Sequence, residues 1–106
     1  MLISTESSFK KDDIITIKNT LGEEIVSKFV SEDLTHYTID KPLALGMSEK
    51  GMQFMPVIVS GDIPGNAIFP KSMVMWAVPS KADIGSQYIQ VTTGLAVPGN
   101  NQKIIV

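Results

Sequence analysis

Apolar and polar residues alternate through the segment between residues 14 and 40. β-branched or aromatic residues recur on alternate positions in three short runs: Ile15 and Ile17, Ile25 and Phe29, and Tyr37 and Ile39. Threonine, lysine or aspartate fills most of the positions between them. A period of two indicates strands with one buried face. Because Leu21-Gly22-Glu23 and Ser31-Glu32-Asp33 interrupt the pattern, we predict three consecutive antiparallel strands joined by tight turns.

Two further apolar segments, residues 52–60 and 72–78, predict two more strands. Pro56 places its position at a sheet edge or a bulge, because proline has no N–H to donate. The second segment is apolar on both faces: Met73, Met75 and Ala77 on one, Val74, Trp76 and Val78 on the other. We expect one face to pack inside the domain and the other against another subunit or the tail. Trp76 is interpreted as a packing residue rather than a base-stacking platform.

Turn residues and local composition predict the segments between these strands. Lys41-Pro42 is expected to end regular pairing, although residues 43–46 extend the third strand if a bulge accommodates them. Residues 61–71, dense in glycine and proline, form a long connection. Residues 79–86 form a loop or a single helical turn, and the alternation in residues 87–93 predicts one more strand.

The two ends of the chain leave alternatives open. Residues 4–13 are consistent with a short helix capped by Ser4 or with a frayed arm, and Phe9 is the side chain that would dock the helix. The segment from Gly94 is polar until the apolar end at residues 104–106. Such an end is either disordered or a docking peptide.

Length and composition indicate one small globular domain. The chain has 106 residues, 43% of them hydrophobic, so a core can form without disulfides or a metal. The absence of cysteine excludes disulfides, thiolate zinc sites and thiol catalysis. No apolar run approaches the roughly 20 residues of a membrane helix, and the first residues do not form a signal-peptide core. We therefore expect a cytoplasmic protein without membrane contact.

The charge pattern disfavours general nucleic-acid binding. The net charge is −2, and all nine basic residues are lysines. Without arginine, bidentate contacts to guanine or phosphate cannot form, so DNA is not expected as a partner. A ring of identical subunits could still line its pore with one repeated lysine.

Catalytic chemistry has little support in the sequence. His36 is the only histidine, and no phosphate-binding loop or nucleophile motif is present. The paired acids Glu23-Glu24 and Glu32-Asp33 occupy turns, where solvation explains them better than acid–base catalysis. We predict that the protein is not an enzyme and holds no metal or cofactor.

Two motifs carry a family resemblance. The first comprises Gly22, Ile25, Ser27, Phe29, Asp33 and Tyr37, and the second is Val59-Ser60-Gly61-Asp62. Together they resemble the two motifs of the Sm and Sm-like (LSm) proteins, and the long tail is similar to that of phage-associated marine members. The resemblance implies an all-β fold: a small, strongly bent five-stranded antiparallel barrel (Sm-like, SH3-like) with a short N-terminal helix. The barrel domain would span residues 1–80, and residues 81–106 would be an extension, partly strand and partly flexible.

The resemblance also implies partners. Family rings pair the fourth strand of one subunit with the fifth of the next, which predicts a cyclic homo-oligomer through residues 52–60 and 72–78. By position, single-stranded RNA would contact Asp33, Thr35, His36, Tyr37, Ser60, Gly61 and Asp62. Thr35, Tyr37 and Ser60 replace the family's stacking residue, asparagine and arginine, so Tyr37 is either a compensating stacking residue or barrel core.

Two functions follow from these implications. The first is an Sm-like ring that binds single-stranded RNA weakly or with altered preference, as an RNA chaperone or scaffold. The alternative is a structural or assembly ring, phage-related in origin, that does not bind nucleic acid.

Overall fold

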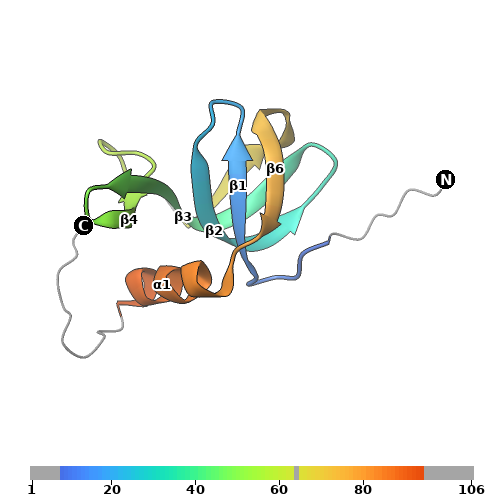
Figure 1. Ribbon diagram of the computed structural model, residues 1–106. Helices are drawn as coiled ribbons and strands as arrows, with labels where there is room; N and C mark the ends of the chain where they lie inside the picture. The colour runs from blue at the N-terminus through green and yellow to red at the C-terminus, as the bar shows by residue number, and fades with distance from the viewer. Residues whose placement is uncertain (1–7, 64, 95–106) are drawn as a thin grey trace.

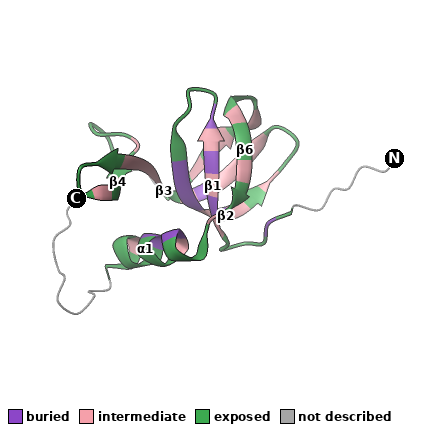
Figure 2. Ribbon diagram, in the orientation of Figure 1, coloured by how far each residue is buried: buried purple, intermediate pink, exposed green. Residues whose placement is uncertain are grey.

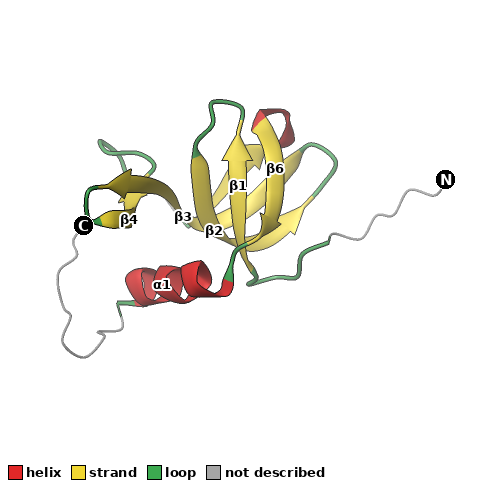
Figure 3. Ribbon diagram, in the orientation of Figure 1, coloured by secondary structure: helices red, strands yellow, loops and turns green. Residues whose placement is uncertain are grey.

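The alternating segments of the N-terminal half form the central strands of the computed structural model, which describes residues 8–63 and 65–94. The described chain folds into six strands, a 3-10 turn and one helix (Figures 1 and 3). The elements are β1 (Ile14–Asn19), β2 (Glu24–Glu32), β3 (His36–Ser48), β4 (Gly51–Pro56), β5 (Asn66–Pro70), the 3-10 turn η1 (Lys71–Met73), β6 (Val74–Pro79) and α1 (Ala82–Thr93).

All six strands belong to one antiparallel sheet, in the order β4-β3-β2-β1-β6, with β5 added beside β3. The meander β1-β2-β3 confirms the three strands predicted from the alternation. After η1, the chain returns across the domain, and β6 pairs with β1 from Ile15 opposite Pro79 to Asn19 opposite Val74. The result is a mostly β fold with one C-terminal helix.

β3 changes partner halfway along its length. Its first part, from His36 to Asp40, pairs with β5, and its second part, from Leu43 to Ser48, pairs with β4. The prediction that Lys41-Pro42 ends the pairing is therefore wrong, and the alternative, that residues 43–46 extend the strand past a bulge, is confirmed by the register shift against β2. Lys41 bends the strand with a left-handed φ of 53°. Pro42 lies where one partner has ended and the next has not begun, so its missing N–H removes no ladder bond to either.

The inner face of the sheet holds the first core. Phe9, Ile15, Ile17, Phe29 and Ile39 are buried together there (Figure 2). The ring of Phe9 lies 5.4 Å from that of Phe29, which confirms Phe9 as a docking side chain. Residues 8–13 form a turn rather than a helix, and the earlier part of the predicted N-terminal helix lies outside the described residues. The buried Phe9 ring and two backbone hydrogen bonds, Asp12 N–H to Phe29 O and Phe29 N–H to Asp13 O, attach this segment to the sheet.

The outer face holds a second core, which α1 covers. Ile84 and Tyr88, one turn apart, are buried against Val26 of β2, with Leu43 and Phe54 at the margin. The prediction of a strand at residues 87–93 is wrong, because these residues belong to α1. The alternation in Gln87–Thr93 favours a strand locally, but burial of the i, i+4 pair Ile84 and Tyr88 decides the conformation.

Tyr88 ties the helix to the bend in β3. Its hydroxyl lies 3.0 Å from the carbonyl oxygen of Asp40 and 2.7 Å from that of Lys41, and it donates to this pair. Burial raises the pKa of Tyr88 far above its ordinary value, and the nearby Asp40 carboxylate raises it further. The hydroxyl therefore stays protonated and continues to donate.

The later strands differ from the prediction in extent. β4 ends at Pro56, so residues 57–60 are not strand, and residues 66–70 of the predicted long connection form β5. A register shift between Lys18 and Asn19 places Val74 and Ala77 against the first core. Met75, Trp76 and Val78 are exposed. The predicted strict alternation of faces in this segment is therefore wrong.

Candidate functional site

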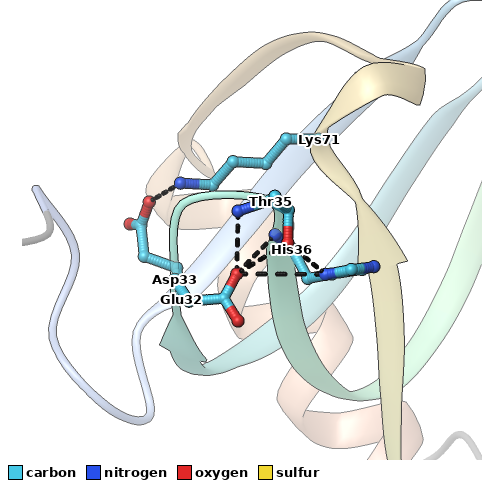
Figure 4. A network of polar contacts seen from close by, with 5 residues as sticks. All are labelled: Glu32, Asp33, Thr35, His36 and Lys71. Atoms are coloured by element: carbon cyan, nitrogen blue, oxygen red, sulfur yellow. Dashed lines mark hydrogen bonds and ion pairs between the residues drawn. The ribbon is translucent and has the colours of Figure 1, made fainter.

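The predicted RNA-binding residues Asp33, Thr35 and His36 lie in the tight turn of residues 33–36 between β2 and β3 (Figure 4). The Oδ1 atom of Asp33 accepts hydrogen bonds from the backbone N–H of Thr35 at 2.8 Å and of His36 at 2.7 Å. These bonds, that of Thr35 first, lower the pKa of the Asp33 carboxyl below its ordinary value. Asp33 therefore acts as the acceptor that holds the turn.

His36 belongs to the same network. Its Nδ1 atom lies 2.7 Å from the hydroxyl of Thr35 and 3.9 Å from Oδ1 of Asp33. This side of the ring therefore faces the turn's own polar groups. His36 therefore has a structural role in the turn, and its role in RNA binding stays a prediction.

Lys71 joins this turn to η1. Its ammonium lies 2.5 Å from Oε2 of Glu32 and 4.9 Å from the centre of the Tyr37 ring. Its backbone N–H donates to the carbonyl oxygen of Thr35 at 2.8 Å. Half-burial of Lys71 and Glu32 strengthens their attraction relative to a fully exposed pair. The cluster holds η1 against the turn.

Tyr37 lies at the margin of the first core. Its ring is 6.4 Å from both Phe9 and Phe29. Burial raises the pKa of Tyr37, the Glu32 carboxylate raises it further, and the Lys71 ammonium acts in the opposite direction. The contacts support the interpretation of Tyr37 as a packing residue, with Lys71 placed over its ring.

The second predicted group, Ser60, Gly61 and Asp62, lies in the exposed loop between β4 and β5. This loop precedes Asn66, which pairs with Asp40, whereas the 33–36 turn lies near Pro70 at the other end of β5. The two groups are thus separated by the length of β5, roughly 15 Å at the usual strand rise. They flank opposite sides of the sheet in Figure 1 and do not form a single site.

A groove opens on the outer face of the sheet, beside the part that α1 covers. Its volume is about 300 Å³. Thr16 and Lys18 of β1 and Glu24 of β2 form the floor. Trp76 of β6 forms one wall, and Leu45 and Met52 of the β3–β4 hairpin form the other. Val78 extends the β6 wall, and Lys81 and Ile84 close the end next to α1.

The strand register explains this composition. Trp76 of β6 pairs with Lys18 of β1, and Lys18 pairs with Glu24 of β2. Glu24 in turn pairs with Leu45 of β3. A row of outward side chains therefore places two charges between two apolar walls. Such a site can bind an amphipathic segment through its apolar and charged groups together.

Trp76 is the aromatic residue that lines this groove, and 63% of its surface is accessible. Trp76 therefore does not pack inside the described domain, and its packing against another subunit or the tail stays a prediction. Met75 of the same strand is 56% exposed, and Met52 across the groove is 50% exposed. These side chains form an apolar surface along β6 and the β3–β4 hairpin.

Several of these residues carry no signal in the sequence. Lys71 reaches Glu32 only because η1 follows β5, an element hidden within a turn-rich segment. Lys18 was identifiable as an outward residue from the alternation of β1, whereas no local pattern marks Lys81. Their convergence with Trp76 depends on the pairing of β6 with β1, which local patterns do not reveal.

Across residues 8–63 and 65–94, no three histidine, aspartate or glutamate side chains gather in a geometry suited to a metal ion. Within the same part of the chain, no helix combines the length and apolar character required to cross a bilayer.

Comparison with known proteins does not assign a family. No protein-family model matches the sequence. A search of curated proteins likewise finds no match.

Proposed function

We propose that this chain is a structural or assembly protein that binds copies of itself through the edges of its sheet. β4 and β6 occupy the two ends of the strand path. The two segments predicted as intersubunit strands, residues 52–60 and 72–78, contain most of these edge strands. A ring with Sm-like barrel subunits, as the resemblance implies, belongs to this proposal.

The observation that carries the proposal is the composition of these edges. Soluble proteins usually protect an edge strand with charged residues or cover it. The strands Gly51–Pro56 and Val74–Pro79 contain no charged residue. Both also present exposed methionines. Pairing with a second copy satisfies the free backbone groups and covers this apolar surface.

A lysine at each edge tests the proposal. Met55→Lys and Met75→Lys add a charge to the predicted contact, so we expect each to shift the protein towards the monomer in sedimentation equilibrium. Leu34→Lys is the matched control, because Leu34 is an exposed apolar residue in the β2–β3 turn. Association that resists both edge variants, or that Leu34→Lys weakens equally, contradicts the proposal.

A second candidate is single-stranded RNA binding, favoured by the exposed Trp76 ring beside Lys18. An aromatic face next to an ammonium can stack a base and attract a phosphate. Trp76 is the only tryptophan, so its fluorescence reports this site directly. Salt-sensitive quenching by oligo-uridine that Lys18→Gln weakens supports RNA binding, whereas unchanged fluorescence rejects it.

A further inference from the structure

The β3–β4 hairpin presents a defined tip away from the rest of the sheet (Figure 1). The hydroxyl of Ser48 donates to the carbonyl oxygen of Gly51 at 3.1 Å and accepts from the N–H of Lys50 at 3.1 Å. Gly51 adopts a left-handed φ of 108°, which favours glycine. The tip is therefore ordered by its own hydrogen bonds.

Two methionines and two charges mark this tip. Met47 and Met52 pair across the hairpin and are 76% and 50% exposed. Glu49 and Lys50 lie between them, both exposed. The tip is thus an apolar pair with one acid and one base at its end. Packing of Leu45 and Phe54 against the second core fixes the base of the hairpin.

The groove offers the complementary groups. Its walls include Trp76 and Val78, and its charged groups are two lysines, Lys18 and Lys81, against one carboxylate, Glu24. Within the described residues, these three charged side chains form no ion pair. A local excess of positive charge in a chain of net charge −2 attracts an acidic group.

We propose that the groove of one copy receives the hairpin tip of a second copy, with Met47 against Trp76 and Glu49 beside Lys81. This contact rests on the self-association proposed above and specifies which residues form it. A groove of about 300 Å³ is at the small end of ligand pockets and suits a few side chains. Methionine adapts to such irregular apolar walls.

Charge reversal tests the contact in the full-length chain. Glu49→Lys and Lys81→Glu should each weaken self-association on the order of tenfold, because each places like charges together. The double variant restores the opposite pairing and should recover most of the affinity. Asp62→Lys is the matched control for Glu49→Lys: it makes the same charge change in the exposed β4–β5 loop and should leave association unchanged.

A second readout follows Trp76. Its emission should shift to shorter wavelength as the protein associates, and Met47→Ala should reduce that shift. Two results overturn the hairpin–groove contact while self-assembly stands, provided that the wild-type chain associates. The first is that Glu49→Lys associates as strongly as Asp62→Lys. The second is that the double variant does not recover the affinity of self-association. If the wild-type chain stays monomeric at every concentration, self-assembly and the contact both fail.

Discussion

Ser27 is a buried polar residue whose hydroxyl has no hydrogen-bond partner within the described chain. It lies on the strand opposite Ile15, itself fully buried. An unsatisfied buried hydroxyl costs free energy, whereas a methyl group of similar shape does not. Ser27 therefore contributes small size rather than polarity at this position.

Ser27→Ala should consequently leave the free energy of unfolding unchanged or raise it by up to about 1 kcal/mol. The measurement is urea denaturation followed by circular dichroism. Ser80→Ala is the control, because the Ser80 hydroxyl lies 2.7 Å from that of Thr16, and its loss should destabilise by about 0.5–1.5 kcal/mol. A larger loss for Ser27→Ala than for Ser80→Ala would show that the Ser27 hydroxyl is satisfied.

Tyr88→Phe removes the hydroxyl that binds the carbonyl groups of Asp40 and Lys41. We expect the free energy of unfolding to fall by about 1–3 kcal/mol, because the two carbonyl groups lose the donor that the buried Tyr88 supplies. Tyr37→Phe should have a smaller effect, since within the described chain the Tyr37 side chain contributes ring contacts rather than a hydroxyl bond. Equal losses in the two variants would contradict the role assigned to the Tyr88 hydroxyl.

The raised pKa of Tyr88 also predicts a pH dependence. The folded-state pKa lies above the ordinary value of 10.0, so above pH 10 the unfolded chain releases this proton first. Stability is then fully present below pH 10 and falls as the pH rises further. Denaturation curves between neutral and strongly alkaline pH should show a steeper decline for the wild type than for Tyr88→Phe. Parallel curves would refute this linkage.

The predicted site shows what residue-level patterns can and cannot reveal. Asp33 is identifiable as a turn residue from its position, and the structure gives it that role. The proximity of residues 60–62 to that turn came from resemblance alone, and the intervening β5 separates them. The pairing of Trp76 with Lys18 depends on a contact between distant strands, so no local pattern could predict it.

At the scale of elements, the meander was predictable because one face of each strand is buried, which imposes a period of two on the sequence. β5 was not predictable from the sequence. Its segment Asn66–Pro70 begins and ends with residues typical of turns, and turn residues also flank it. The second part of α1, residues 87–93, was mistaken for a strand because its β-branched residues Ile89, Val91 and Thr93 alternate. Only the tertiary contacts of Ile84 and Tyr88 favour the helix.

The helix therefore depends on its buried side chains more than on its own propensity. Ile84→Ala should lower the free energy of unfolding by about 2–5 kcal/mol, because it leaves a cavity between α1 and Val26. Ile89→Ala, on the exposed side of the same helix, should change it much less. Thermal and urea unfolding of both variants provide the comparison, and similar losses would argue against the observed helix orientation.

At the scale of the whole molecule, two small cores share one sheet. The first lies inside the curl of the sheet, and the second lies between its outer face and α1. The hairpin and α1 extend from the body, and the longest dimension of 52 Å is twice the other two, 26 and 25 Å. An elongated form of this kind exposes much surface for its size, including the apolar edges of β4 and β6.

The exposed apolar edges of β4 and β6 are the main reason to expect self-association. The molar mass in solution tests this expectation most directly. Light scattering coupled to size exclusion, over a rising series of concentrations, should yield a mass that is a multiple of the 11.5 kDa chain. Trp76 emission should shift to shorter wavelength over the same series. A constant mass of 11.5 kDa with unchanged emission, up to the highest concentration that remains soluble, would contradict the proposed assembly.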